Sequence, residues 1–493
     1  MREERVTRNI ALLLTVGICA GTLSGCRYSS FDEYLEALGI KDPPYEEVTD
    51  AATYEQTLVV SEDSITSSEE PVPAFQASKE DDYTYSTLDS SETVVFFDEA
   101  AEEDSEPEIG FDADRVFKSS YKELTESELN EEMKNARLSV GLTPENIEAM
   151  KKEQKGLYAF DRLTGLGQTL YVEILAIIQH QAENVMVSTT SDDAIDLVFD
   201  YVCADHPELF YVDGYKYTNY TIDNTITKIG FSGSYTYTPE EVSRKQTQIN
   251  QAVNECLAGA PTSTDDYYAI KYVYEYLIQN VEYDLDAPDN QNICSVFIGK
   301  KSVCNGYSKA AQLLLNKLGI KCTLVTGTVD TKRARNVRHA WNLVLCNDAY
   351  YYVDVTWGDS SYQVGNGENA DATRLPAVNY DYLNVTTDEI MRNHTISDEI
   401  YMPGCNSMKD NYYVREDEYF TSAELVLIGD LFNRRYQDGS SSVVIKCANK
   451  SVYDQLFEQL VTQRQVFDYL QGDNSTVSYT SFVDTNTLIF WIA

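Results

Sequence analysis

The stretch Ser302-Val303-Cys304-Asn305-Gly306-Tyr307 decides how the rest of this chain is organised. After it, apolar residues recur at steps of three and four, which predicts a helix that begins at Cys304 and ends at Gly319. The residues that carry this pattern are Ala310, Ala311, Leu314, Leu315 and Leu318. A thiol at the start of such a helix faces the positive end of the helix dipole, which favours the nucleophilic thiolate.

Two later segments, His339–Asn342 and Val353–Trp357, are predicted to be strands of one β-hairpin. Asn347-Asp348 is the expected turn, because short loops of these residue types connect antiparallel strands. With a turn of two residues, Cys346 faces Ala349. This pairing then sets the register of every residue farther along both strands.

In this register His339 faces Thr356 and is the diagonal neighbour of Asp354 on the same face of the hairpin. Such neighbours lie about 7–8 Å apart between backbones, so the carboxylate is within reach of the imidazole. A turn of odd length without a bulge would put them on opposite faces. Cys304, His339 and Asp354 then supply a nucleophile, a base and a carboxylate that orients the base. This is the set of groups needed for covalent acyl transfer.

These segments resemble the bacterial transglutaminase-like superfamily, whose members share the papain-like fold. The resemblance covers residues 155–400 and implies an α+β core. In that core, the helix that bears the cysteine packs on an antiparallel sheet that bears the histidine and the aspartate. The resemblance implies that Cys304 is the nucleophile, His339 the general base and Asp354 the orienting carboxylate. The stretches that carry it are residues 206–212, 283–284, 303–307, 339–342, 352–357 and 382–385, together with His394.

The superfamily includes cross-linking enzymes, peptidases, amidases and inactive members, so the resemblance leaves the reaction open. We expect Cys304 to attack an amide carbonyl, with its own backbone N–H as one oxyanion donor, while His339 protonates the leaving amine. Water would then resolve the thioester by hydrolysis, and a lysine amine would resolve it by cross-linking. Hydrolysis is slightly favoured, because nothing in the sequence visibly excludes water.

Asn305, Trp341 and Trp357 are predicted to border the substrate cleft, although an aromatic residue beside a catalytic strand can also serve packing alone. No cofactor is expected. Only four histidines are present, and none lies at metal-ligand spacing from another or from a cysteine pair, so no metal site is predicted. The basic residues of the segment 331–338 form either a site that attracts an anionic substrate or a plain exposed loop.

The N-terminus has the features of an exported lipoprotein. Three arginines precede an apolar run over residues 10–20, which is too short to span a bilayer and leads to Leu23-Ser24-Gly25-Cys26. This ending resembles a bacterial lipobox, which implies cleavage of residues 1–25 and lipidation of Cys26. The chain would then lie on the extracellular side of the bacterial cell membrane, held by its lipid anchor. The alternatives are a plain signal peptide and a buried helix in an unprocessed chain.

Residues 26–115 are strongly acidic, with 26 Asp or Glu against four Lys or Arg, a net charge of −22 out of −42 for the whole chain. Their short apolar clusters do not offset chain entropy, so they are predicted to form a disordered tether. Their spacing follows no calcium-loop pattern. The acidity also argues against nucleic acid as a partner. We expect a monomer that acts on a peptide or protein substrate, with cell-wall peptide as one candidate.

The rest of the chain is predicted to form three parts. These are a helical and strand region over 116–262, the catalytic core over 263–404 and a small α+β accessory module over 405–493. Eight cysteines lie outside the signal peptide and lipid site. Removing Cys304 leaves an odd number, so a full disulfide framework is not expected. The competing functional class is a non-enzymatic surface lipoprotein that binds peptide or glycan through the cleft, the accessory module or the tyrosine-rich strands of residues 215–237.

Overall fold

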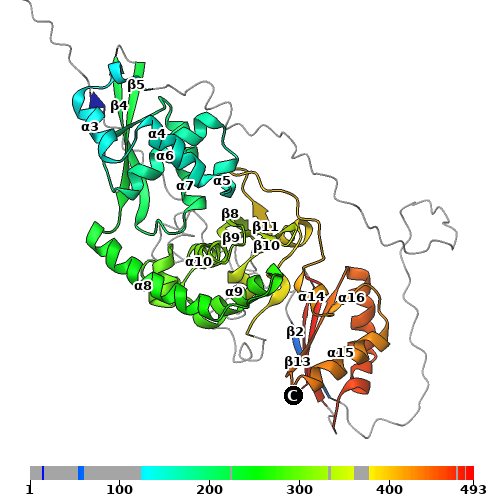
Figure 1. Cartoon of the computed structure of the whole chain (residues 1–493). Coiled ribbons are helices and arrows are strands. Elements are labelled where there is room, and N and C mark those ends of the chain that lie inside the picture. Colours follow the sequence, from blue (N-terminus) through cyan, green and yellow to red (C-terminus); the bar gives the residue numbers. More distant parts are fainter. Residues whose placement is uncertain are drawn as a thin grey trace, which may run out of the picture.

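The structure is a computed structural model that describes residues 124–222, 225–330, 335–359, 377–472, 476–483 and 485–492, with the backbone of Leu14–Thr15 and Tyr54–Val59. Within these residues, three main sheets are flanked by helices (Figure 1). Their strand orders are β1-β4-β5-β3, β10-β9-β8-β11 and β12-β13-β15-β14-β2. The α+β fold class predicted from the sequence is therefore confirmed.

The N-terminal part is built around helix α6 (Gly165–Gln179), whose residues from 169 to 178 are all buried. Because this helix is apolar on every side, neighbouring elements have to cover it completely. The helices around it are α3 (Glu131–Ser139), α4 (Pro144–Gln154), α5 (Tyr158–Asp161) and α7 (Asp192–Asp205), and the strands are β3 (Val185–Val187), β4 (Val212–Ile222) and β5 (Thr225–Tyr235). The side chains of Tyr215 and Phe231 on β4 and β5 point into this core.

The central part places helix α10 (Cys304–Lys317) on the antiparallel sheet β10-β9-β8-β11 (Figure 1). The strands of this sheet are β8 (Cys322–Val329), β9 (Val337–Cys346), β10 (Ala349–Val353) and β11 (His394–Ile396). The helices α8 (Pro239–Ala258) and α9 (Asp266–Asn280) come before it, with the short parallel pair β6 (Glu282–Tyr283) and β7 (Lys301–Ser302) and the π-helical turn η3 (Ser295–Gly299). The expected packing of the cysteine-bearing helix on the sheet is confirmed.

The register of the β9–β10 hairpin agrees with the prediction at its turn, because Ala349 pairs with Cys346. Strand β10 ends earlier than expected, however. Asp354 leaves the strand and caps the short helix α11 (Val355–Gly358), so the segment after Val353 is not a strand. The physical reason is local, since an aspartate that accepts the amides of the second and third residues after it favours a helix start over a longer strand.

The C-terminal part has an apolar core of its own, with Phe432, Ile445 and Phe490 among its fully buried residues. Its helical elements are α14 (Tyr412–Arg415), α15 (Leu425–Gln437), α16 (Lys450–Phe457), η6 (Glu458–Thr462) and η7 (Gln465–Tyr469), and its strands are β12 (Tyr419–Phe420), β13 (Ser442–Cys447), β14 (Thr476–Phe482) and β15 (Thr487–Trp491). The sequence predicts an α+β accessory module over 405–493. The buried residues of this C-terminal core run from Phe420 to Ile492, whereas Tyr412 and Tyr413 of α14 belong to the main core.

Two short N-terminal stretches form strands. Leu14–Thr15 (β1) pairs with the edge of β4, and Tyr54–Val59 (β2) pairs with β14 in antiparallel register. The prediction of a disordered tether is therefore wrong for Tyr54–Val59, whose β-prone sequence completes an otherwise open sheet edge. The rest of the predicted signal peptide, Cys26 and the rest of the acidic stretch lie outside the described residues.

Among the described helices, none combines the length and the apolar character that crossing a bilayer requires. All eight cysteines of the described residues are free thiols, as expected from their odd number without the nucleophile.

Candidate active site

Cys304 is the first residue of α10 and is 8% exposed. The chain enters the helix through Val303, whose extended conformation (φ −122°, ψ −177°) ends the preceding strand β7. Gly306, one turn away, lies so close to the Ser302 hydroxyl that a Cβ there would overlap it. The Ser302 hydroxyl is itself fixed by the Ser295 hydroxyl at 2.6 Å. The tight entry therefore explains why the second residue after the cysteine, Gly306, is a glycine.

His339 and Asp354 come together as the hairpin register predicts. The Nε2 atom of His339 lies 2.7 Å from Oδ2 of Asp354, and both side chains are almost completely buried. The other oxygen of Asp354, Oδ1, accepts the backbone N–H groups of Thr356 (2.9 Å) and Trp357 (3.1 Å). The helix cap that shortens β10 thus also orients the carboxylate toward the imidazole.

Buried charges explain the protonation state of this pair. Burial lowers the pKa of His339, but the Asp354 carboxylate and the hydrogen-bonding contact with the Cys304 thiol more than reverse this effect, so the pKa is raised. Burial raises the pKa of Asp354, but His339 and His394 together hold it well below its usual range. The arrangement therefore favours an imidazolium beside an ionised carboxylate, with the Cys304 sulfur within hydrogen-bonding range of the ring.

The position of Cys304 relative to the sheet depends on a residue that the sequence analysis did not single out. The Ser308 hydroxyl lies 2.7 Å from the carbonyl oxygen of Ala340 on β9 and 2.8 Å from that of Cys304. Nδ2 of Asn342 on β9 donates to the carbonyl oxygen of Ser308 at 3.0 Å. These contacts attach the first turns of α10 to the strand that bears the imidazole.

A second histidine reaches the same carboxylate. Nε2 of His394, on strand β11, lies 3.0 Å from Oδ2 of Asp354, and its side chain is fully buried. Burial lowers the pKa of His394, and the nearby His339 lowers it further. The sequence identified His394 only through its place at the end of the resembling segment, because its contact with Asp354 depends on the pairing of β11 with β8.

Two tryptophans surround the imidazole. Trp341 is 0% exposed and stacks against His339 with ring centroids 5.8 Å apart. It therefore packs behind the imidazole, which differs from its expected place in the cleft wall. Trp357 is partly exposed and contacts His339 edge to face, with centroids 6.3 Å apart.

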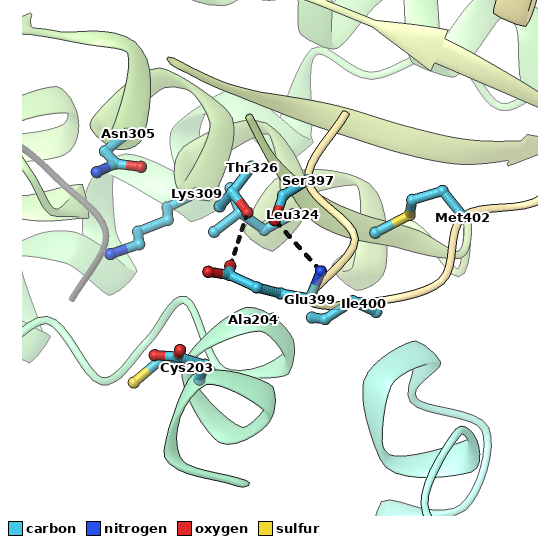
Figure 2. A pocket seen from close by; sticks show the side chains of 11 residues that line it. Cys203, Ala204, Asn305, Lys309, Leu324, Thr326, Ser397, Glu399, Ile400 and Met402 are labelled. Atoms are coloured by element: carbon cyan, nitrogen blue, oxygen red, sulfur yellow. Dashed lines mark hydrogen bonds between the residues drawn. The ribbon is translucent and has the colours of Figure 1, made fainter. Parts of the chain in front are cut away.

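Asn305, the residue after Cys304, lines a pocket (Figure 2). Its Nδ2 donates to Oε1 of Gln291 at 2.9 Å. Glu399 lies on the opposite wall, and Oγ1 of Thr326 donates to its carboxylate at 3.5 Å (Figure 2). The lining residues are Asp200, Cys203, Ala204, Asn305, Lys309, Leu324, Thr326, Ser397, Glu399, Ile400 and Met402.

Asp200 and Lys309 of this pocket have shifted pKa values. Burial, followed by the neighbouring carboxylates of Glu399 and Asp196, raises the pKa of Asp200 to about 7. Burial lowers the pKa of Lys309, which lies near the sulfur atoms of Cys203 and Cys304. The pocket beside the nucleophile therefore holds ionisable groups of both signs between largely apolar walls.

The ligand atoms of His339, Asp354 and His394 all lie within 4.8 Å of one another, a geometry that a metal ion could also use. The two Nε2–Oδ2 distances, 2.7 and 3.0 Å, are those of hydrogen bonds to one shared oxygen. We therefore assign the cluster as a hydrogen-bonded group. Of the basic segment beside His339, Arg335 and Arg338 are exposed, while Lys332 and Arg333 lie outside the described residues.

Residues 251–355 match the model of the transglutaminase-like superfamily. Similar solved structures include a TGase, with 15% identity over 34% of this chain and 50% of that chain (TM-score 0.22). A candidate cysteine protease from Cytophaga hutchinsonii shows 10% identity over 29% of this chain and 62% of that one (TM-score 0.20). Menin shows 16% identity over 48% and 49% (TM-score 0.20). The chain thus spans about half to three fifths of the length of these structures, and no curated protein matches it.

Proposed function

We propose that this chain, which contains a transglutaminase-like domain, is a cysteine-dependent acyl-transfer enzyme that acts on amide bonds of peptides or proteins. The observation that supports this proposal is the buried 2.7 Å bond between His339 and Asp354, with the Cys304 thiol among the groups that raise the pKa of the same imidazole. A thiol, a base and an orienting carboxylate arranged in this order make up a nucleophilic triad.

The first chemical step uses each group in turn. The Cys304 thiolate attacks the amide carbonyl carbon and forms the Sγ–C bond, while the imidazolium of His339 donates its proton to the leaving nitrogen as the C–N bond breaks. Because the pKa of His339 is raised, the ring holds this proton before the substrate arrives. The backbone N–H of Cys304 has no acceptor within α10, since it is the first residue of the helix, and is free to bind the oxyanion.

The second step consumes the thioester. His339, now neutral, removes a proton from the incoming nucleophile as that nucleophile bonds to the acyl carbon. The C–Sγ bond then breaks, which releases Cys304 as the thiolate beside the imidazolium of His339. With water as nucleophile the product is a carboxylic acid, and with a lysine amine it is a cross-link. We propose hydrolysis as the main reaction, because water reaches a nucleophile that is only 8% exposed more easily than a lysine side chain of another protein does.

The proposed setting is the bacterial cell surface. Lipidation of Cys26 would anchor the chain to the extracellular side of the membrane, where peptides of the cell wall and extracellular proteins are the available substrates. The pocket beside Asn305 is the proposed place for a part of the substrate next to the scissile bond.

The alternative function, in which the protein only binds peptide or glycan, gains no support from the hairpin β4–β5. Tyr215 and Tyr217 are buried, and Tyr215 stacks on Phe231 with ring centroids 5.6 Å apart. These tyrosines pack in the core, so they offer no exposed stripe for a glycan.

The deciding experiment is incubation of the protein with model peptides, with and without a primary amine, followed by mass spectrometry. Backbone cleavage, loss of ammonia and incorporation of the amine would each identify a different reaction. Cys304→Ala is expected to abolish every product, and Cys447→Ala, which changes a buried thiol in the separate C-terminal core, is the matched control. The proposal fails if Cys304 reacts with iodoacetamide near pH 6 no faster than a free thiol and His339→Ala has no effect on that rate.

A further inference from the structure

We infer that His394 is a positioning residue for Asp354, and this inference rests on the proposed function. His394 itself faces neither the substrate pocket nor the sulfur, so it acts through the carboxylate. Its Nε2–H donates to Oδ2 of Asp354 at 3.0 Å, since an ionised carboxylate can only accept. The same oxygen also accepts from His339 at 2.7 Å.

The shared oxygen is the first reason for this role. Asp354 accepts four hydrogen bonds, two at Oδ1 from backbone amides and two at Oδ2 from imidazoles. The bond from His394 occupies one side of Oδ2, so only one direction remains for His339. A carboxylate held in this way keeps the catalytic ring in one orientation and one tautomer.

The second reason is that His394 belongs to a closed ring of contacts with Asp354. Oδ1 of Asn393 lies 2.6 Å from Nδ1 of His394, and Nδ2 of Asn393 donates to the Tyr382 hydroxyl at 2.8 Å. The carbonyl oxygen of Tyr382 accepts the backbone N–H of Asp354 at 2.9 Å. The ring thus runs from Asp354 through His394, Asn393 and Tyr382 back to Asp354, and it holds the carboxylate at both its backbone and its side chain.

The third reason is enclosure. His394 is surrounded by Asp354, His339 and the aromatic rings of Trp341, Trp357 and Tyr382. Burial and the nearby His339 lower the pKa of His394, whereas the hydrogen bond to Asp354 raises it. The packed rings hold the imidazole against Oδ2 of Asp354.

The test compares two substitutions of His394 in the full chain. His394→Gln keeps a side-chain N–H donor at the place of Nε2, whereas His394→Phe keeps a ring and removes the donor. The readout is the rate of Cys304 alkylation by iodoacetamide from pH 4 to pH 10, which needs no substrate. His180→Phe, at the C-terminal end of α6 and far along the chain from the triad, controls for the loss of a histidine.

We expect His394→Phe to react about tenfold more slowly at pH 6 and to move the acid limb of the profile toward that of a free thiol, because one hydrogen bond to a charged group is lost. His394→Gln should restore most of the rate, and His180→Phe should match the original protein. With an active peptide substrate, His394→Phe should lower kcat while KM changes by less than about twofold.

The results separate a positioning role from a purely structural one. A folded His394→Phe variant with an unchanged profile overturns the inference, as does a His394→Gln variant that is as slow as His394→Phe. If His394→Phe does not fold, Asn393→Ala opens the ring of contacts while the imidazole stays, and an unchanged profile for that variant also overturns the inference. If Cys304 shows no enhanced reactivity at all, the proposed function fails. NMR titration of the His339 ring then tests the inference separately. The inference is wrong if His394→Phe and Asn393→Ala both leave that titration unchanged.

Discussion

Lys446 and Asp381 form a buried ion pair, with Nζ of Lys446 2.6 Å from Oδ1 of Asp381. Lys446 belongs to strand β13 of the C-terminal module, and Asp381 belongs to the 3₁₀ turn η5 (Tyr380–Tyr382) beside the catalytic carboxylate. The carbonyl of the next residue, Tyr382, accepts the backbone N–H of Asp354. The module is thus attached to the segment that supports the triad.

Breaking this pair should destabilise the protein. Lys446→Met leaves the Asp381 charge buried without its partner, and we expect the free energy of unfolding to fall by about 3–5 kcal/mol. Urea unfolding of the full chain measures the change. The double variant Lys446→Met/Asp381→Asn should recover a large part of it, because the uncompensated charge is gone. A single variant that loses less than about 1 kcal/mol would contradict the prediction.

The His339–Asp354 pair should make stability depend on pH. The pKa of His339 is raised from its ordinary value of 6.5, so its contribution is complete below pH 6.5 and is lost as pH rises through the folded-state pKa. The pKa of Asp354 is lowered from 3.8, so its contribution is present above pH 3.8 and is lost as pH falls through the folded-state pKa. The pair therefore contributes most between pH 3.8 and 6.5.

Comparing the original protein with His339→Gln checks this dependence. The difference in free energy of unfolding should be largest between pH 4 and 6.5 and should shrink toward pH 9, because the charged pair is lost as pH rises. The difference that remains reflects lost packing, which does not depend on pH. A constant difference over this range would show that the two side chains do not form a charged pair.

Asp200 should show the opposite linkage. Its pKa is raised to about 7, so the unfolded chain loses the proton first and the folded state becomes less stable as pH rises from 3.8 to 7. Asp200→Asn removes the charge and should stabilise the protein by about 1–4 kcal/mol at pH 8, with no gain at pH 4. Thermal or urea unfolding at both pH values tests this, with the exposed Asp192→Asn on the same helix as control. If Asp200→Asn changes the free energy of unfolding equally at both pH values, the pKa of Asp200 is not raised.

Gly306→Ala should disturb the entry to α10. The added Cβ would overlap the Ser302 hydroxyl and crowd the Asn290 carbonyl, so we expect a loss of about 1–3 kcal/mol together with slower alkylation of Cys304. Gly165→Ala, at the start of α6, meets no atom within 4 Å and should be neutral or slightly stabilising. Equal stability of the two variants would show that the entry has room to relax.

Features set by neighbouring residues were predictable from the sequence. The periodicity after Cys304 indicated the nucleophile helix, and the two-residue turn after Cys346 indicated a register that brings His339 to Asp354. Both depend on interactions within a few residues or across one hairpin. The sequence did not indicate that Asp354 caps a helix. An aspartate at this position is compatible both with a longer strand and with hydrogen bonds to the backbone amides of Thr356 and Trp357.

Features that join distant segments were decided by the tertiary structure alone. His394 meets Asp354 only because β11 pairs with β8, and Lys446 meets Asp381 only because the C-terminal module docks on the core. Tyr54–Val59 joins the edge of β14 in the same way, across more than 400 residues of chain. The amino-acid sequence by itself pointed to Cys304, His339 and Asp354, because each is marked by the pattern of its own helix or hairpin. The contacts that orient the carboxylate depend on pairing between segments far apart in the chain, and no pattern of neighbouring residues encodes them.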